Sequence, residues 1–492
     1  MRRVARRGAV LVALAAILLV AGATGAAAHP LGNFTVNTYS GLRVGPDRLA
    51  VDYVVDMAEI PTFQARQTID ADHDGRLAAP EAARWRDQEC ERLGGGLRAT
   101  LDGRSLPLAV TGSALRFPTG VGGLETLRLE CALAASLPAG RASARSLAYA
   151  DTNLRGRVGW REVSAVGDRA TLETGDVPAT SVSARLTAYP SDQLSSPLDQ
   201  RTANLRFRPG GSTAADPGAG GTGPVVRGGV DGATAAFTAL VGERSRSAGF
   251  AVVAILLAVA LGGAHALAPG HGKTAMAAYL VGLRGTLRHA LTIGVTVTVT
   301  HTAGVLLLGL VLSSTRAVAS ERVYPWLGLA SGLLLAAVGV GLLARARTGH
   351  AHSHGPGHAH LHGPDHDHPH GHGHDIDHRA AGPPLGRRGL VALGLAGGLV
   401  PSPSAVVVLL GGIALGRAWF GVALVLAYGL GMAATLTGIG LLLARLRNRV
   451  DRRLRLPAGS VLTRLGRLLP TVSASVILLV GLAVAVRGAA GI

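Results

Sequence analysis

The sequence predicts a multi-pass α-helical membrane protein with an N-terminal, mostly-β extracytoplasmic domain that carries an EF-hand-like loop. Of the 492 residues, 48% are apolar, and several apolar runs reach the roughly 20 residues that a helix needs to cross a bilayer. The chain begins with a basic and then apolar segment, and a region of alternating apolar and polar residues precedes the first long apolar run. These patterns are typical of a signal peptide and of half-buried strands.

The N-terminal segment, residues 1–28, has the three parts of a signal peptide. Arginines begin it, an apolar core follows, and alanines 26–28 form a small-residue cleavage site. An uncleaved anchor helix is the alternative. Residues 29–190 are expected to form the extracytoplasmic domain, with strands near 48–55 and 126–132.

The chain has two cysteines, Cys90 and Cys131, and both lie in this exported part. In an oxidising compartment the pair is expected to form a disulfide, and two free thiols are the alternative. Residues 191–245 are rich in glycine and proline, which predicts a flexible linker. The linker is expected to end in a short lead-in helix at 233–243.

An acidic loop lies inside the exported domain. It has aspartates at loop positions 1, 3 and 5, glycine at position 6 and glutamate at position 12, which is the pattern of an EF-hand. Residues 60–69 and 82–93 are expected to supply the flanking helices. The alternative is an acidic turn between strands. The candidate calcium ligands are Asp70, Asp72, Asp74, the carbonyl of Arg76, and Glu81.

Six apolar spans are expected to form two groups of three transmembrane helices, at 246–344 and 389–488. The loops 270–288, 345–388 and 445–469 hold 16 lysines and arginines, against 4 in the loops and tail on the other side. The positive-inside rule places these three loops in the cytoplasm and the N-terminal domain outside the cytoplasmic membrane. The spans are expected at 248–268, 289–313, 325–344, 389–414, 418–444 and 470–487.

A polar island interrupts the end of the first span, where the sequence from His265 reads HALAPGHGK. Pro269 has no N–H, so the carbonyl of His265 loses its helical partner, and such a break in lipid is tolerated where it lines a cavity. Ionisable side chains in an apolar segment mark a path or a site. The alternative is a turn at the membrane surface with His271 and Lys273 as interfacial anchors. The motif residues are Pro269, Gly270, Gly272 and Lys273.

A related pattern occurs in the fourth span, where a glycine pair precedes Pro401, Ser402 and Pro403. Two halves of three spans must have opposite topology. Paired broken helices in a 3+3 inverted repeat are a common plan of secondary transporters, with the site between them.

The spans contain no aspartate or glutamate, so histidines carry the ionisable chemistry. His301 lies between two threonines in the second span, where a hydrogen bond across a helix interface is the alternative to metal binding. Together with His265 and His271 it favours a borderline transition metal, because imidazole suits nickel, cobalt, copper and zinc, whereas magnesium and calcium prefer carboxylates.

The loop after the third span contains 12 of the 18 histidines. Such a tract forms no core and binds divalent transition metals reversibly, so we expect a cytoplasmic buffer or sensor rather than part of the transport path. Its histidines are His350, His352, His354, His358, His360, His362, His366, His368, His370, His372, His374 and His378.

The motifs HALAPGHGK at 265–273, THT at 300–302 and GGLVPSPS at 397–404 resemble the NicO family of nickel/cobalt permeases, which includes RcnA-type efflux proteins. The His-rich loop fits this family, and the opening HPLGNFTVN at 29–37 resembles the exported domain attached to some members. The resemblance implies Ni²⁺ or Co²⁺ as substrate and a metal path through His265, His271 and His301. The family often has cysteine where Ser402 stands, so a thiolate ligand is excluded here.

The predicted function is therefore a secondary transporter of Ni²⁺ or Co²⁺, with efflux favoured over uptake. A zinc transporter of the same type is the main alternative, and a metal sensor is a minor one. No enzyme chemistry is indicated. Leu267 stands where a phosphate-binding loop needs glycine, which argues against a nucleotide site. The arginines flank apolar spans rather than form one basic patch, which argues against nucleic acid; membrane lipid and metal ions are the expected partners, and no protein partner is indicated.

Overall fold

The computed structural model describes residues 31–120, 124–138, 143–194, 196–213, 248–267, 275–276, 278–280, 286–314, 320–348, 385–414, 416–453 and 461–490. The chain divides into two compact units. One includes the N-terminal domain, and the other comprises Ala258–Val305, Arg322–Ser402 and Leu426–Ile492. The expected signal peptide, lead-in helix and His-rich tract 350–378 lie outside the described residues.

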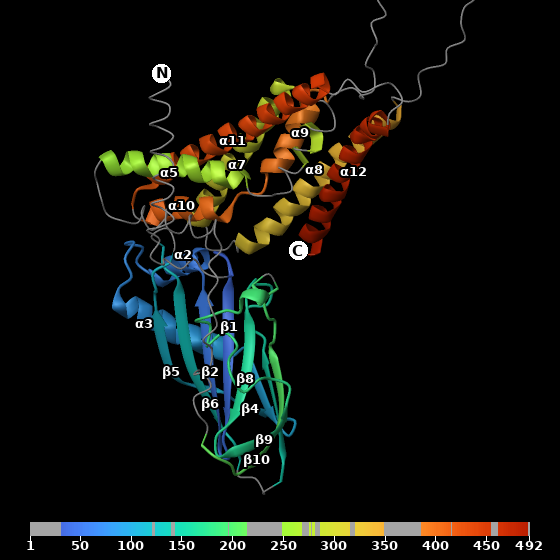
Figure 1. Ribbon diagram of the computed structural model, residues 1–492. Coiled ribbons are helices and arrows are strands. Elements are labelled where there is room, and N and C mark those ends of the chain that lie inside the picture. Colours follow the sequence, from blue (N-terminus) through green and yellow to red (C-terminus); the bar gives the residue numbers. More distant parts are fainter. Residues whose placement is uncertain are drawn as a thin grey trace, which may run out of the picture. The chain divides into compact units, whose positions relative to one another are not determined.

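The N-terminal domain is a sandwich of two five-stranded sheets (Figure 1). The first sheet has the order β5-β6-β2-β1-β8 and is antiparallel except for β1 and β8, which run parallel. The second has the order β4-β3-β7-β10-β9 and is antiparallel. The strands are β1 Val36–Val44, β2 Arg48–Met57, β3 Leu97–Leu101, β4 Arg104–Leu106, β5 Ala109–Arg116, β6 Leu127–Ser136, β7 Arg145–Asp151, β8 Arg161–Gly167, β9 Ala170–Gly175 and β10 Thr202–Pro209.

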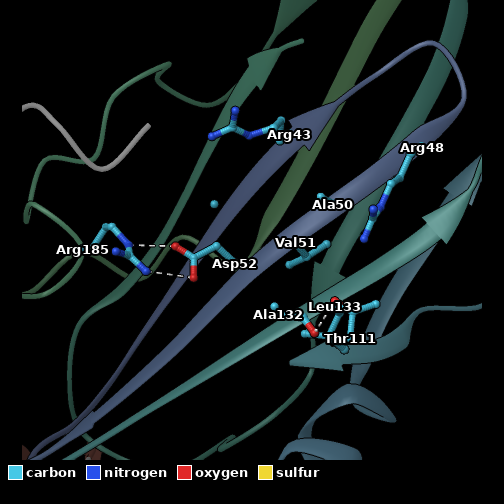
Figure 2. A pocket seen from close by; sticks show the side chains of 10 residues that line it. Arg43, Arg48, Ala50, Val51, Asp52, Thr111, Ala132, Leu133 and Arg185 are labelled. Atoms are coloured by element: carbon cyan, nitrogen blue, oxygen red, sulfur yellow. Dashed lines mark hydrogen bonds and ion pairs between the residues drawn. The ribbon is translucent and has the colours of Figure 1, made fainter. Parts of the chain in front are cut away.

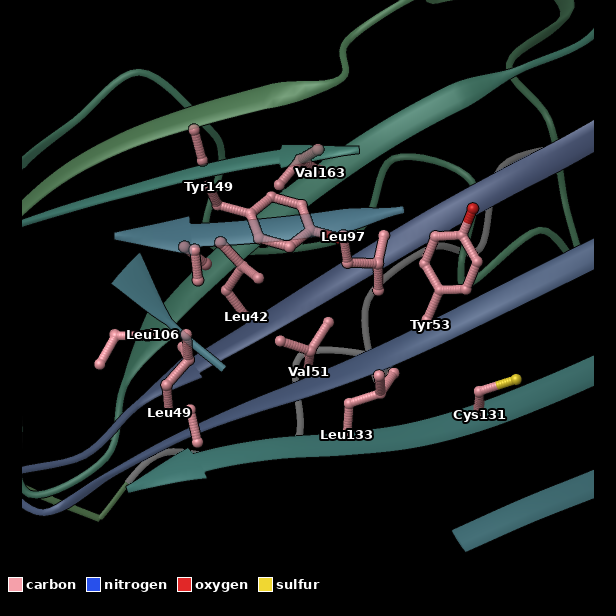
Figure 3. Close-up of a cluster of buried hydrophobic side chains, with 14 of the residues drawn as sticks. Leu42, Leu49, Val51, Tyr53, Leu97, Leu106, Cys131, Leu133, Tyr149 and Val163 are labelled. Atoms are coloured by element: carbon pink, nitrogen blue, oxygen red, sulfur yellow. The ribbon is translucent and has the colours of Figure 1, made fainter. Parts of the chain in front are cut away.

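Several strands alternate buried and exposed side chains, and the buried ones form the core of the sandwich. In β6 every second side chain is buried, because successive residues of a strand point to opposite faces. Leu49, Val51 and Leu133 of the first sheet meet Leu97 and Tyr149 of the second (Figure 3). The strands predicted near 48–55 and 126–132 are β2 and β6.

Two helices flank the acidic loop, α2 Glu59–Ile69 and α3 Ala79–Gly94. Helix α3 contacts β5 and β6, and it buries Cys90 and Leu93. Cys90 forms a disulfide with Cys131 of β6, with 5.6 Å between the two Cα atoms. The bond ties the helix after the loop to β6, the strand next to the β5 edge of the first sheet.

The end of the N-terminal domain differs from the expectation. We expected the linker to begin at residue 191, but β10 lies beyond that point and pairs with both β7 and β9. Its alternation of buried and exposed residues is that of a half-buried strand. The glycine and proline residues that suggested a linker begin only at its end, so the folded domain extends to at least Pro209.

The remaining described chain is helical. Four helices are long and apolar enough to cross a membrane, and the bent pair α9 and α10 makes a fifth candidate; α5 contains a shorter apolar stretch. This fits a membrane protein with an N-terminal β-rich domain. The helices are α5 Ala248–Leu267, α7 Leu287–Ser314, α8 Ser320–Thr348, α9 Arg387–Gly398, α10 Pro403–Ala414, α11 Ala418–Arg453 and α12 Val461–Ala490.

Glycines bring several of these helices into backbone contact, and three of the crossings link segments that are far apart in the sequence. A Cβ atom at Gly262 of α5 would overlap the carbonyl oxygen of Tyr428 of α11. At Gly398 of α9 it would overlap the carbonyl oxygen of Val297 of α7, and at Gly332 of α8 it would overlap the backbone of α12. Small residues allow this close approach in membrane helices. Each of these three crossings joins one helix that precedes the His-rich loop to one that follows it.

Candidate metal site

Two of the three predicted metal-path histidines come together in the structure. His265 lies two residues before the end of α5, and His301 lies near the middle of α7. Their ring centroids are 5.9 Å apart, and the rings are inclined by 42°. His301 is 6% exposed, and His265 is partly buried.

The spacing of the two rings suits a shared ion. With nitrogen–metal bonds of about 2.1 Å, the centroids of two imidazoles on one ion lie roughly 5–6.5 Å apart. Imidazole is a good ligand for nickel, cobalt and zinc. Their α-helices hold them in an apolar region, where an ionisable group marks a functional position.

Tyr428 of α11 also lies beside His265, with 5.7 Å between their ring centroids. The crossing of α5 and α11 fixes this contact. Gly262 meets Tyr428 at that crossing, and a Cβ atom at Gly431 would in turn overlap the carbonyl oxygen of Val259. We did not anticipate Tyr428 from the sequence, although a tyrosine within an apolar span beside small residues is a usable signal.

Ser402 lies against His301. Its backbone N–H donates to Nε2 of His301 at 3.4 Å, and its hydroxyl oxygen lies 3.3 Å from the same nitrogen. Ser402 is 7% exposed and occupies the break between α9 and α10. This contact was not predicted, since the two residues are 101 positions apart in the sequence.

The break itself follows from two prolines. Pro401 and Pro403 have no N–H and cannot continue a helical hydrogen-bond ladder, and α9 and α10 are bent by 67° across the residues between them. The break lies over α7, because a Cβ atom at Gly304 would lie 3.7 Å from Pro401. The motif in the fourth span therefore faces the helix that carries His301.

The motif after His265 lies outside the described residues. Pro269, Gly270, His271, Gly272 and Lys273 are all in that segment. The structure therefore brings together His265, His301 and Ser402, and it leaves the predicted contribution of His271 untested.

In the N-terminal domain, the acidic loop gathers Asp70, Asp72 and Asp74. One carboxylate oxygen of each lies within 4.8 Å of the others, a spacing that a single cation can bridge. The backbone N–H of Gly75 donates to Asp70 Oδ2 at 2.9 Å, while Oδ1 of Asp70 is buried without a hydrogen-bond partner. Gly75 has φ of +80°, which favours glycine there.

Glu81, at the last position of the loop, turns back toward it. The Glu81 carboxylate accepts hydrogen bonds from the backbone N–H groups of Ala71, Asp72 and Ala78 at 2.8, 3.3 and 3.0 Å. The bonds from Ala78 and Ala71 hold the pKa of Glu81 below its usual value, so the side chain stays ionised. Arg76 lies in the loop, and its backbone N–H donates to Asp74.

A shallow pocket of about 300 Å³ lies on the first sheet of the same domain (Figure 2). Small residues such as Gly41 and Ala132 line it, and Arg43, Arg48 and Arg185 bring positive charge to it. Arg185 forms an ion pair with Asp52.

Helices long enough to cross a membrane, with two histidine rings 5.9 Å apart beside them, indicate a membrane protein with a candidate transition-metal site. Comparison with known proteins also indicates a transition-metal transporter. RcnA of Escherichia coli K12, a nickel/cobalt efflux system, is 36% identical over 260 residues, which is 48% of this chain and 92% of that protein. The chain belongs to this family of RcnA-type nickel/cobalt transporters.

Other relatives show the same extent of similarity. RcnA of Salmonella typhimurium LT2 is 34% identical over 274 residues, which is 48% of this chain and 93% of that protein. A protein of Methanocaldococcus jannaschii is 31% identical over 228 residues, which is 46% of this chain and 89% of its own length. No family model matches the chain, and no solved structure matches it.

Proposed function

We propose that this protein exports Ni²⁺ or Co²⁺ from the cytoplasm as a secondary transporter, and that the ion passes between His265 and His301. The observation that carries the proposal is the 5.9 Å approach of these two rings within apolar helices. The names of the relatives, nickel/cobalt efflux systems, support both the substrate and the direction. His271, predicted from the sequence, would supply a third imidazole.

The donor set favours a borderline metal over a hard one. Two imidazoles suit nickel, cobalt or zinc, whereas calcium and magnesium prefer several carboxylate oxygens. The break at Pro401 and Pro403, together with the break that the sequence predicts at Pro269, fits a site between inverted repeats, so rocking of the halves would expose it to each side in turn.

The test is the nickel and cobalt content of intact cells that express the wild type or His301→Ala at matched protein levels. Lower metal in wild-type cells, lost in the variant, indicates efflux; higher metal indicates uptake through the same site. No difference for either metal contradicts the substrate, and zinc is then measured. His289→Ala is the matched control, because His289 is also on α7 but contacts Tyr279.

We further propose that the His-rich loop buffers metal and is not part of the path. Deletion of residues 350–378 should change the apparent affinity or the regulation of transport, while His271→Ala should abolish it. Equal loss of transport in both variants would contradict the distinction between path and buffer.

The proposed topology is six membrane spans in the cytoplasmic membrane with the N-terminal domain outside. The concentration of arginine in three loops supports this orientation. Attachment of a membrane-impermeant thiol reagent to cysteines introduced at exposed Arg76 and, separately, at Arg445 checks it in intact cells. Labelling at Arg445→Cys but not at Arg76→Cys would reverse the orientation.

We also propose that the acidic loop binds Ca²⁺ and stiffens the exported domain. The three clustered aspartates and the unpartnered oxygen of Asp70 support this. Affinity of the order of 10⁻⁴–10⁻³ M is expected, as in extracellular EF-hand modules. Radioactive calcium binding to the full-length protein should be lost in Asp70→Asn and retained in Asp87→Asn, a carboxylate on α3 outside the loop. Equal binding by both variants would contradict the site.

A further inference from the structure

One ring nitrogen of His301, Nε2, already contacts the protein, at Ser402. The backbone N–H of Ser402 points at Nε2, so Nε2 accepts and carries no proton. The neutral imidazole then carries its proton on Nδ1, and Nε2 holds the lone pair that a metal ion needs. The hydroxyl of Ser402 lies 3.3 Å from the same atom.

The position of Ser402 makes it suited to this contact. It stands between Pro401 and Pro403, neither of which has an N–H, so Ser402 supplies the one backbone donor of the three residues. It directly precedes α10, where the N–H groups have no helical acceptors. The backbone N–H and the hydroxyl of Ser402 therefore both lie within hydrogen-bond distance of Nε2 of His301.

We infer that Ser402 is a positioning residue that competes with the transported ion for Nε2 of His301. This rests on the proposed function. Binding of an ion to His301 breaks the contact with the α9–α10 break, and the contact reforms when the ion leaves. Ser402 thus weakens ion binding and speeds ion release. Because Ser402 lies in the break between α9 and α10, its contact with His301 also links occupancy of the site to the position of that break.

The competition predicts a specific kinetic pattern. Ser402→Ala removes the hydroxyl and keeps the N–H, so the loss of one ordinary hydrogen bond should lower KM for Co²⁺ by about two- to fivefold. Because release slows by the same interaction, kcat should fall by a similar factor and kcat/KM should change little. Ser402→Thr keeps the hydroxyl and should behave as the wild type.

The experiment measures initial rates of Co²⁺ entry into proteoliposomes of full-length protein, read by quenching of an enclosed fluorophore. Ser331→Ala is the matched control, since Ser331 is a buried serine whose hydroxyl donates to the backbone carbonyl of Ala396 and not to a histidine. Its KM should stay at the wild-type value. If Ser402→Ala does not accumulate, Ser402→Gly also removes the hydroxyl and carries the same prediction.

An unchanged or raised KM in Ser402→Ala overturns the inference, and a raised KM would make Ser402 a ligand instead. His301→Ala separates this from failure of the proposed function. If His301→Ala abolishes transport while Ser402→Ala matches the wild type, only the role of Ser402 is wrong. If His301→Ala transports normally, the metal path itself is wrong.

Discussion

The crossing of α5 and α11 offers a sharp test of how the candidate site is held. Gly431 of α11 faces the backbone of Val259, and a Cβ atom there would overlap a carbonyl oxygen that no side-chain rotation can move. In Gly431→Ala the two helices must separate by about 1–2 Å to reach the 3.5–4.0 Å spacing of ordinary contacts. That separation moves His265 of α5 away from Tyr428 of α11.

Two effects of known size follow. Overpacking of a close interface costs typically about 1–3 kcal/mol, which should lower the thermal unfolding midpoint. A displacement of about 1 Å at a site that requires fixed geometry costs up to about a hundredfold in rate, so Co²⁺ transport should fall at least tenfold.

The matched control lies on the same helix. A Cβ atom at Gly438 meets nothing within 4 Å, so Gly438→Ala creates no overlap. Alanine also favours a helix over glycine by about 0.5–1 kcal/mol. Gly438→Ala should therefore transport as the wild type does and unfold at the same or a higher temperature. Equal behaviour of the two variants, in the proteoliposome assay and in thermal unfolding, would refute the reasoning.

Three predictions concern the N-terminal domain of the full-length protein and can be checked by pulse proteolysis in urea. Replacing Cys90 and Cys131 with serine should cost about 4 kcal/mol, from the chain entropy of a loop with a sequence separation of 41. Leu133→Ala should cost about 2–5 kcal/mol, because Leu133 is 1% exposed between the sheets. The N–H of Ser146, and then Arg145, lower the pKa of Asp102 from 3.8, so its stabilising effect is present above that pH and lost as pH falls below it. Asp102→Asn should therefore flatten the acid end of the stability profile.

The sequence predicted the parts of this molecule that depend on local pattern. Alternation located β2 and β6, and the spacing of aspartates and glycine located the loop between α2 and α3. Two prolines predicted the break at Pro401–Pro403, because a missing N–H interrupts a helix whatever surrounds it. The names of the relatives confirmed the family that the motif at 265–273 had suggested.

What the sequence did not predict depends on contacts between distant segments. The parallel pairing of β1 with β8 and the late strand β10 are set by tertiary packing, which no local period records. The approach of Tyr428 to His265 requires the crossing of α5 and α11, and the contact of Ser402 with His301 requires the break to lie over α7. The periodic pattern of apolar residues is a local property of the sequence, and it does not indicate which helices become neighbours.

The glycine crossings also bear on how the chain is made. Helices α5, α7 and α8 leave the ribosome before the His-rich loop, whereas their partners α11, α9 and α12 leave after it. During synthesis the glycine faces of α5, α7 and α8 therefore contact lipid until the partner helices α11, α9 and α12 have been made. Assembly of the helical region is completed only when α12 has been inserted, so a chain that terminates early contains the histidines of α5 and α7 without the helices that hold them.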